Sequence, residues 1–133
     1  MNKSLLIAAL ILATGSSFAA TDHYILRDGN HVQHLKITKI NDDIKLSLDV
    51  DFEPNANETD KKSCSAVISG DAKSVGPNEV ILKKHSEGEA TYCELKVHLS
   101  PNGAKVEQTN DCDNFVTGIC HFSTDGKEMV KIK

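Results

Sequence analysis

Four cysteines carry the most definite chemistry in this 133-residue chain: Cys64, Cys93, Cys112 and Cys120. In an oxidising compartment an even number of cysteines points to two disulfides, whereas a zinc site here would lack any C-x-x-C pair. Four cysteines allow three pairings, and the sequence alone does not select one. Our working prediction pairs Cys64 with Cys93 and Cys112 with Cys120. Chain entropy gives these bridges upper limits of about 3.6 and about 2.6 kcal/mol.

Six histidines could act as metal ligands or as acid–base groups. His31 and His34 are the closest pair, but residues three apart on a strand face opposite sides and cannot share a metal ion. His98 shares the polar face of a predicted strand with Glu94 and Lys96, where solvation explains it. We therefore expect no metal and no cofactor, and we expect the histidines to become partly charged near pH 6.

No arrangement of side chains predicts a particular reaction. Ser69-Gly70 matches part of a nucleophile elbow, but the preceding glycine and the following helix are missing. Paired cysteines cannot act as nucleophiles, and no pair among the 19 acidic residues stands out as a glycosidase dyad. No glycine-rich phosphate loop occurs. We therefore expect a protein that is not an enzyme, with a small hydrolase using an unrecognised site as one alternative.

Alternating hydrophobicity indicates the elements that would hold these residues. Residues 44–52 alternate strictly between apolar and polar side chains, as do residues 92–99. A period of two places the apolar set on one face of a strand, and Cys93 belongs to that inward set. Asn41-Asp42-Asp43 separates residues 44–52 from a similar run before it, which predicts a β-hairpin.

Eight short strands are expected in all, and no helical stretch of comparable strength follows residue 20. They cover residues 32–40, 44–52, 64–69, 80–82, 92–99, 104–108, 115–122 and 129–132. Turn residues separate them, and residues 53–63 are too polar to be anything but a loop. The predicted fold is all-β, a small antiparallel β-barrel or sandwich stapled by two disulfides.

The first residues predict export. Lys3, the apolar run of residues 5–13 and Ser17-Phe18-Ala19 have the order of a signal peptide over residues 1–19. The run is too short to span a bilayer. Residues 20–133 would then form one periplasmic or secreted domain without a membrane span. Without Lys3, 14 basic residues face 19 acidic ones, a net charge of −5. This charge disfavours nucleic acid and suits a basic protein partner.

Two segments are the candidate binding surfaces. Ser69, Gly70 and Asp71 follow a predicted strand, and Asp113 and Asn114 lie in the stretch 111–118 that the second predicted disulfide would constrain. Loops held by a rigid scaffold are typical of binding proteins and inhibitors.

The pattern as a whole resembles a group of small exported bacterial proteins with a β-barrel-like domain and two disulfides. Periplasmic lysozyme inhibitors and the immunity proteins that neutralise cell-wall hydrolases are examples. Cys93-Glu-Leu-Lys-Val and the segment 112–122, Cys-Asp-Asn-Phe-Val-Thr-Gly-Ile-Cys-His-Phe, carry the likeness. The C-type inhibitor family uses a Ser-Gly-x-x-Tyr loop. Ser69 and Gly70 match its first two positions, and Lys73 stands in place of the tyrosine. The resemblance implies that Ser69 and Gly70 contact the target.

The expected function is therefore that of an exported, non-enzymatic binding protein. The resemblance and the acidic charge together favour an inhibitor or immunity protein against a cell-wall hydrolase such as lysozyme. A structural or accessory protein of the bacterial envelope is the alternative from a different class.

Overall fold

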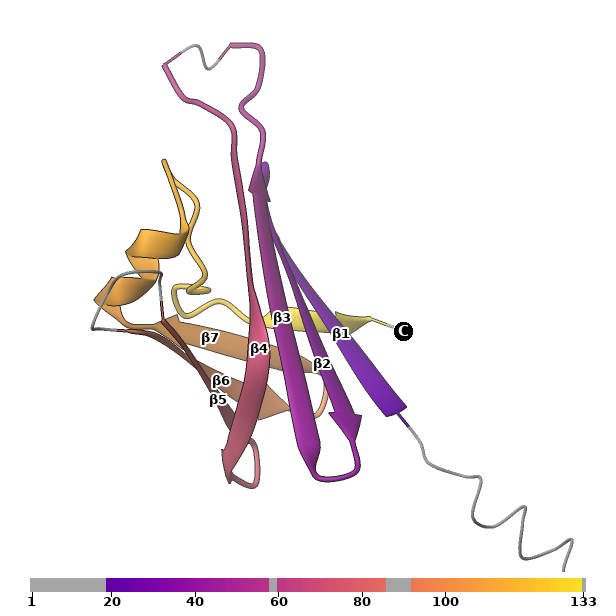
Figure 1. The fold of residues 1–133 in the computed structure, drawn as a ribbon. Helices are drawn as coiled ribbons and strands as arrows, with labels where there is room; N and C mark the ends of the chain where they lie inside the picture. The colour runs from indigo at the N-terminus through magenta and orange to yellow at the C-terminus, as the bar shows by residue number, and fades with distance from the viewer. Residues whose placement is uncertain (1–18, 58–59, 86–91, 133) are drawn as a thin grey trace, which may run out of the picture.

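The computed structural model describes residues 19–57, 60–85 and 92–132 (Figure 1). The predicted signal peptide lies outside these ranges except for Ala19. Within them, no helix is both long and apolar enough to cross a membrane. Their elements are β1 (Ala19–Asp28), β2 (His31–Ile40), β3 (Asp43–Phe52), β4 (Cys64–Gly76), β5 (Glu79–His85), β6 (Tyr92–Ser100), β7 (Gly103–Gln108), the 3-10 helix η1 (Asn110–Phe115) and β8 (Met129–Ile132).

The strands form one closed antiparallel barrel in the order β1-β2-β3-β4-β5-β6-β7-β8, which confirms the all-β prediction. Each strand pairs with its neighbours in sequence, so the topology is a simple meander. Figure 1 shows the long strands β1–β4 side by side, with β5–β7 crossing behind them. The predicted alternation in β3 holds: Leu46, Leu48, Val50 and Phe52 are buried inside the barrel. The same is true of Cys93, Leu95 and Val97 in β6.

One predicted strand is wrong and one was missed. Residues 115–122 do not form a strand: Phe115 ends η1, and Gly118 has a φ of +58°, which breaks an extended run. The missed strand is β1. Its centre, Tyr24-Ile25-Leu26, is apolar on both faces, and this hides the period of two that reveals a strand.

The barrel closes through very few ladder pairs. The short β8 pairs with three residues of β1 and with two residues of β7. The rest of this seam is covered by the irregular segment 116–127. There Thr124 donates its backbone N–H to the carbonyl of Val106, and its hydroxyl accepts the N–H of Val106. β8 pairs only with the first two residues of β7, and the segment supplies hydrogen bonds to β7 beyond them, at Val106.

Gln33 anchors this segment from inside the barrel. Its side chain is 1 % exposed, and its Nε2 donates to the backbone carbonyls of His121 and Ser123 at 2.8 and 2.9 Å. On the other side, the Oε1 of Gln108 accepts the backbone N–H groups of Phe122 and Ser123. Side-chain amides thus satisfy backbone groups that have no strand partner.

The predicted disulfide pairing is wrong. Cys64 bonds to Cys120, and Cys93 bonds to Cys112. The cause is topological. β7 runs back along β6 and leads directly into η1, where Thr109 donates its N–H to the carbonyl of Glu94. This return brings Cys112 to Cys93 at the start of β6. Cys120 belongs to the seam segment, which lies against the start of β4. The two bridges agree with an oxidising compartment.

Removing matched and mismatched cysteines tests this pairing. The double change Cys64→Ala, Cys120→Ala should lower the free energy of unfolding by about 4 kcal/mol, and Cys93→Ala, Cys112→Ala by about 3 kcal/mol. The mismatched pair Cys64→Ala, Cys93→Ala breaks both bridges. It should cost roughly the two losses together and leave two thiols that react with an alkylating reagent. Urea unfolding and mass spectrometry measure these outcomes. A mismatched variant without free thiols would contradict the connectivity.

Candidate functional site

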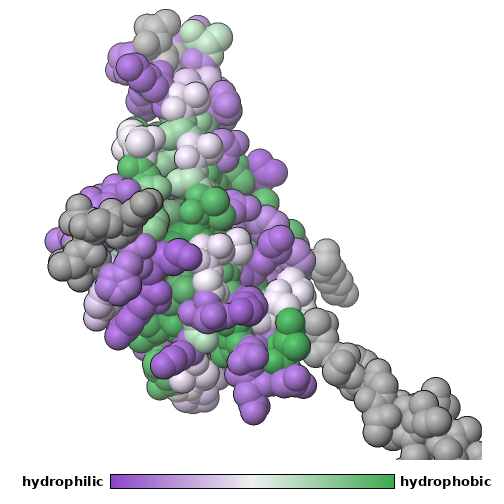
Figure 2. Space-filling view, viewed as in Figure 1, coloured by the Kyte–Doolittle hydropathy of each residue, from purple (hydrophilic) through white to green (hydrophobic). Residues whose placement is uncertain are grey.

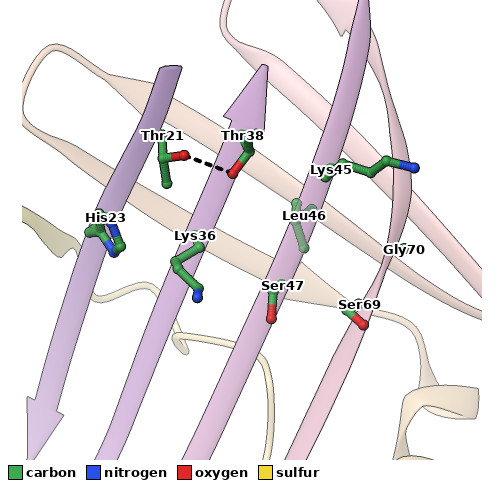
Figure 3. Close-up of a pocket in the computed structure, with 9 residues that line it drawn as sticks. All are labelled: Thr21, His23, Lys36, Thr38, Lys45, Leu46, Ser47, Ser69 and Gly70. Atoms are coloured by element: carbon green, nitrogen blue, oxygen red, sulfur yellow. Dashed lines mark hydrogen bonds between the residues drawn. The ribbon is translucent and has the colours of Figure 1, made fainter. Parts of the chain in front are cut away.

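The outer face of β1–β4 brings together polar side chains from four strands. Strand register places His23 opposite Lys36, Lys36 opposite Ser47, and Ser47 opposite Ser69. All four point away from the core, because residues two apart on a strand share a face. They form a row of an imidazole, an amine and two hydroxyls across the sheet (Figure 3).

A second row lies next to the first. It consists of Thr21, Thr38, Lys45 and Asp71 in register across the same strands. The hydroxyls of Thr21 and Thr38 are 3.0 Å apart, and Lys45 donates from Nζ to Asp71. This hydrogen bond raises the pKa of Lys45 above its ordinary value. All residues of the two rows except Asp71 line an open depression of about 590 Å³.

Toward the β3–β4 connection, the same face carries acidic side chains and an exposed apolar one. Asp49 lies opposite both His34 and Val67, and Asp51 follows it on the outer side of β3. Val67 is 59 % exposed. The Nδ1 of His23 lies 3.2 Å from the Nε2 of His34, which connects this part to the depression. Figure 2 shows hydrophilic residues over much of this side of the molecule, interrupted by separate apolar areas.

The outer face of β5–β7 is also charged, but its charges are used internally. Lys83 lies 3.8 Å from Glu94, and Lys96 lies 3.9 Å from Glu79. The Nε2 of His98 lies 2.8 Å from Glu107, and this contact lowers the pKa of the Glu107 carboxyl. On β1–β4, by contrast, Lys36, Asp49 and Asp51 have no ion-pair or hydrogen-bond partner among the described residues. These three charges therefore face solvent without a described partner.

The structure places the predicted binding residues on two separate surfaces. Ser69 and Asp71 are exposed, and Ser69 lines the depression. Gly70 also lines it, but a Cβ at Gly70 would point inward and lie 3.2 Å from Leu82. These residues do not end a strand as predicted, because β4 continues to Gly76.

Asp113 and Asn114 lie on η1 and are also exposed. Asp113 accepts a hydrogen bond from Gln108 at 3.2 Å. In the ranges that the structure describes, no hydrogen bond or ion pair joins these residues to Ser69 or Asp71.

Sequence reasoning missed His23, Lys36 and Ser47 as companions of Ser69. They come from three different strands, and only the register between strands places them together. A signal was nevertheless present for Ser47, since it lies on the polar side of the strictly alternating run of residues 44–52.

The side chains around the depression are hydrogen-bonding groups. The hydroxyl of Ser69 has no hydrogen-bond partner among the described residues, so no base there activates it. Backbone N–H groups in the middle of a sheet are engaged in the ladder and cannot form an oxyanion hole. Within the described ranges, no three His, Cys, Asp or Glu side chains are grouped so as to hold a metal ion. Hydroxyls, an amine and imidazoles remain as groups that bind polar partners.

The histidines form two contacts that spacing did not predict. His31 faces the barrel interior and His34 faces outward, as expected for residues three apart. His31 stacks on His121, with ring centroids 4.3 Å apart and planes at 15°. His31 is 7 % exposed, and its pKa is lowered by burial and by the neighbouring His121. The nearby carboxylates of Asp28 and Asp125 oppose this shift without reversing it.

Comparison with models of protein families, with curated proteins and with solved structures finds no match to this chain. The site is therefore interpreted from its own residues and their chemistry.

The buried His31 predicts a loss of stability in mild acid. The unfolded chain takes up a proton near the ordinary pKa of 6.5, whereas the folded chain resists it to lower pH. The stabilisation is fully present above pH 6.5 and decreases as pH falls toward the folded pKa. It changes by up to about 1.4 kcal/mol per pH unit.

Urea unfolding between pH 7 and pH 5 measures this slope. His31→Phe, which keeps a ring against His121, should make the slope shallower. His85→Gln removes an exposed histidine at the end of β5 and should leave the slope unchanged. Equal slopes in all three proteins would contradict the assignment to His31.

Proposed function

We propose that this protein is an exported, non-enzymatic binding protein of the periplasm or the secreted fraction, and that it inhibits a cell-wall hydrolase such as lysozyme. The outer face of β1–β4 is its docking surface in this proposal. An immunity protein is an inhibitor of this kind, directed at a hydrolase that would otherwise attack the producing cell.

The contrast between the two outer faces carries the proposal. Glu79, Glu94 and Glu107 on β5–β7 each have a cationic partner on the same face. Lys36 and Asp49 on β1–β4 have none among the described residues. Exposed charges without partners cost little in water and gain complementary contacts when a partner binds. The β1–β4 face is therefore the better candidate for recognition.

The scaffold supports this use of the face. Register across four long strands fixes the spacing of its side chains. The two disulfides tie η1 to β6 and the seam segment to β4. A surface that is ordered before binding loses less entropy when the complex forms.

The charge of the chain supports a basic target. The net charge of −5 expected for residues 20–133 attracts a basic hydrolase, and Asp49 and Asp51 concentrate part of it on the proposed face. Attraction of this kind raises the association rate more than it lengthens the life of the complex. The exposed Val67 beside Asp49 offers an apolar contact within the same area.

The Ser-Gly pair would contact a target differently from the loop of the C-type inhibitors. Ser69 and Gly70 lie inside β4 and not on a projecting loop. In our proposal Ser69 contacts the target as part of a flat sheet surface, with Ser47 and Lys36 beside it. Gly70 then has a packing role, because it leaves room for Leu82 inside the barrel.

Binding and inhibition assays with a panel of lysozymes and other cell-wall hydrolases test the proposal. The native protein should bind at least one basic hydrolase and slow its lysis of cell-wall suspensions. Ser69→Arg should weaken this binding by about tenfold or more, because a long cation would fill the depression. Asp49→Lys should act mainly by slowing association.

A matched charge reversal separates the face from the net charge. Glu107→Lys changes the net charge as much as Asp49→Lys does, but on the internally paired face. It should change affinity far less. Asp113→Lys probes the surface around η1 in the same way. If the native protein binds none of the hydrolases, the proposed function is refuted. If Asp113→Lys weakens binding more than Asp49→Lys does, the docking surface lies around η1 instead.

A further inference from the structure

We infer that a second site, at the end of the barrel beside the seam, binds the carboxylate group of a small organic acid or of a peptide C-terminus. A pocket of about 370 Å³ opens there between the β1–β2 turn, the end of β3 and the seam segment. Its walls include His31, His121, Phe52, Ile119 and Lys61. None of these residues belongs to the β1–β4 depression, so this inference stands independently of the proposed function.

The inner wall contains an unsatisfied hydrogen-bonding group. The Nε2 of His31 is buried and has no hydrogen-bond partner within residues 19–57, 60–85 and 92–132, on a side chain that is only 7 % exposed. A buried polar atom without a partner costs free energy that a ligand can recover. Because burial and His121 lower the pKa of His31, the ring is neutral at pH 7 in the empty pocket. With its proton on Nε2, it can donate to an oxygen acceptor.

The acidic groups beside His31 are already engaged. The carboxylate of Asp28, which lines the pocket, is bound by Lys127, with Nζ and Oδ2 2.7 Å apart. The carboxylate of Asp125 accepts from the hydroxyl of Ser123 and lies 3.6 Å from the Nε2 of His121. Both carboxylates therefore have partners, and a lysine, Lys61, lines the same pocket.

The position of His121 adds a second nitrogen to the same wall. Its Nδ1 lies 2.7 Å from the carbonyl oxygen of Ser123, which fixes the proton on Nδ1. Its Nε2 lies 3.6 Å from the carboxylate of Asp125, so each ring nitrogen of His121 lies near an oxygen atom. The stacked arrangement with His31 holds both rings in one orientation.

The remaining walls indicate the body of the ligand. Phe52 is buried, and Ile119 is 45 % exposed, so each presents apolar surface to the pocket. The hydrogen bond from Asn30 to Asn55, at 2.6 Å, holds the β1–β2 turn against the segment that follows β3. The volume is near the lower limit for small-molecule sites. A carboxylate on a short apolar body fits this combination better than inorganic phosphate.

Titration followed by long-range ¹H–¹⁵N NMR of the imidazole groups tests the inference in the full chain. The probes are isobutyrate, N-acetyl-Ala-Ala with a free or an amidated C-terminus, and inorganic phosphate. A carboxylate probe should shift the signals of His31 and His121 in a saturable way. Binding of isobutyrate identifies small acids as the source. Preference for the free peptide over both its amide and isobutyrate identifies a peptide C-terminus.

Two variants establish that this pocket is responsible. His31→Phe keeps a ring against His121 but removes the donor, and it should weaken binding at least about tenfold. Ile119→Glu places a negative charge at an exposed position of the pocket wall, where it repels the carboxylate of the ligand. It should weaken binding as much as His31→Phe does, without disturbing the core. His85→Gln, remote from the pocket, should bind as the native protein does.

The inference is overturned if none of the carboxylate probes gives a saturable shift. It is also overturned if phosphate is the only probe that binds. Equal affinity in the native protein and in Ile119→Glu would also overturn it, and this holds even if His31→Phe fails to fold. Neither result bears on hydrolase binding, which is measured on the other face.

Discussion

Closure of the barrel by its irregular C-terminal segment is the constraint on which the remaining structure depends. β8 pairs with too few residues of β1 and β7 to complete the ladder. Gln33 from β2 and Gln108 from β7 hold the segment between them through four backbone groups. The bridge from Cys64 to Cys120 ties the same segment to β4. Because Gln33 is buried, loss of these partners would leave its amide unsatisfied, so its packing depends on the seam segment.

The two outer faces follow from this closure. In a closed barrel each strand has only one side in water, and the register between strands decides which polar side chains meet there. On β5–β7 the register places opposite charges next to each other, as in Lys83 and Glu94. On β1–β4 it places Lys36 beside Ser47 and Asp49 beside Val67. The same all-β architecture thus pairs all three glutamates on the outer face of β5–β7, whereas on β1–β4 it leaves Lys36 and Asp49 without a partner among the described residues.

The sequence alone predicted the parts of the fold that depend on local order. Strict alternation identified β3 and β6, and the turn residues around Asp42, Pro77, Pro101 and Gly126 were placed where the chain reverses or turns. Features set by distant contacts could not be predicted. The disulfide partners depend on the return of β7 into η1, and the companions of Ser69 depend on pairing among four strands. The strand expected at 115–122 failed for the same reason, because its backbone is satisfied by side-chain amides.

The seam also connects the two stacked histidines to the stability of the whole domain. His31 lies at the start of β2, and His121 lies in the segment that closes the barrel. The two rings stack with centroids 4.3 Å apart, and burial together with His121 lowers the pKa of His31, so protonation of His31 opposes the packing of that segment. The proposed ligand site and the closure of the barrel therefore share the same residues, and a ligand that binds only the folded chain should stabilise the closed seam.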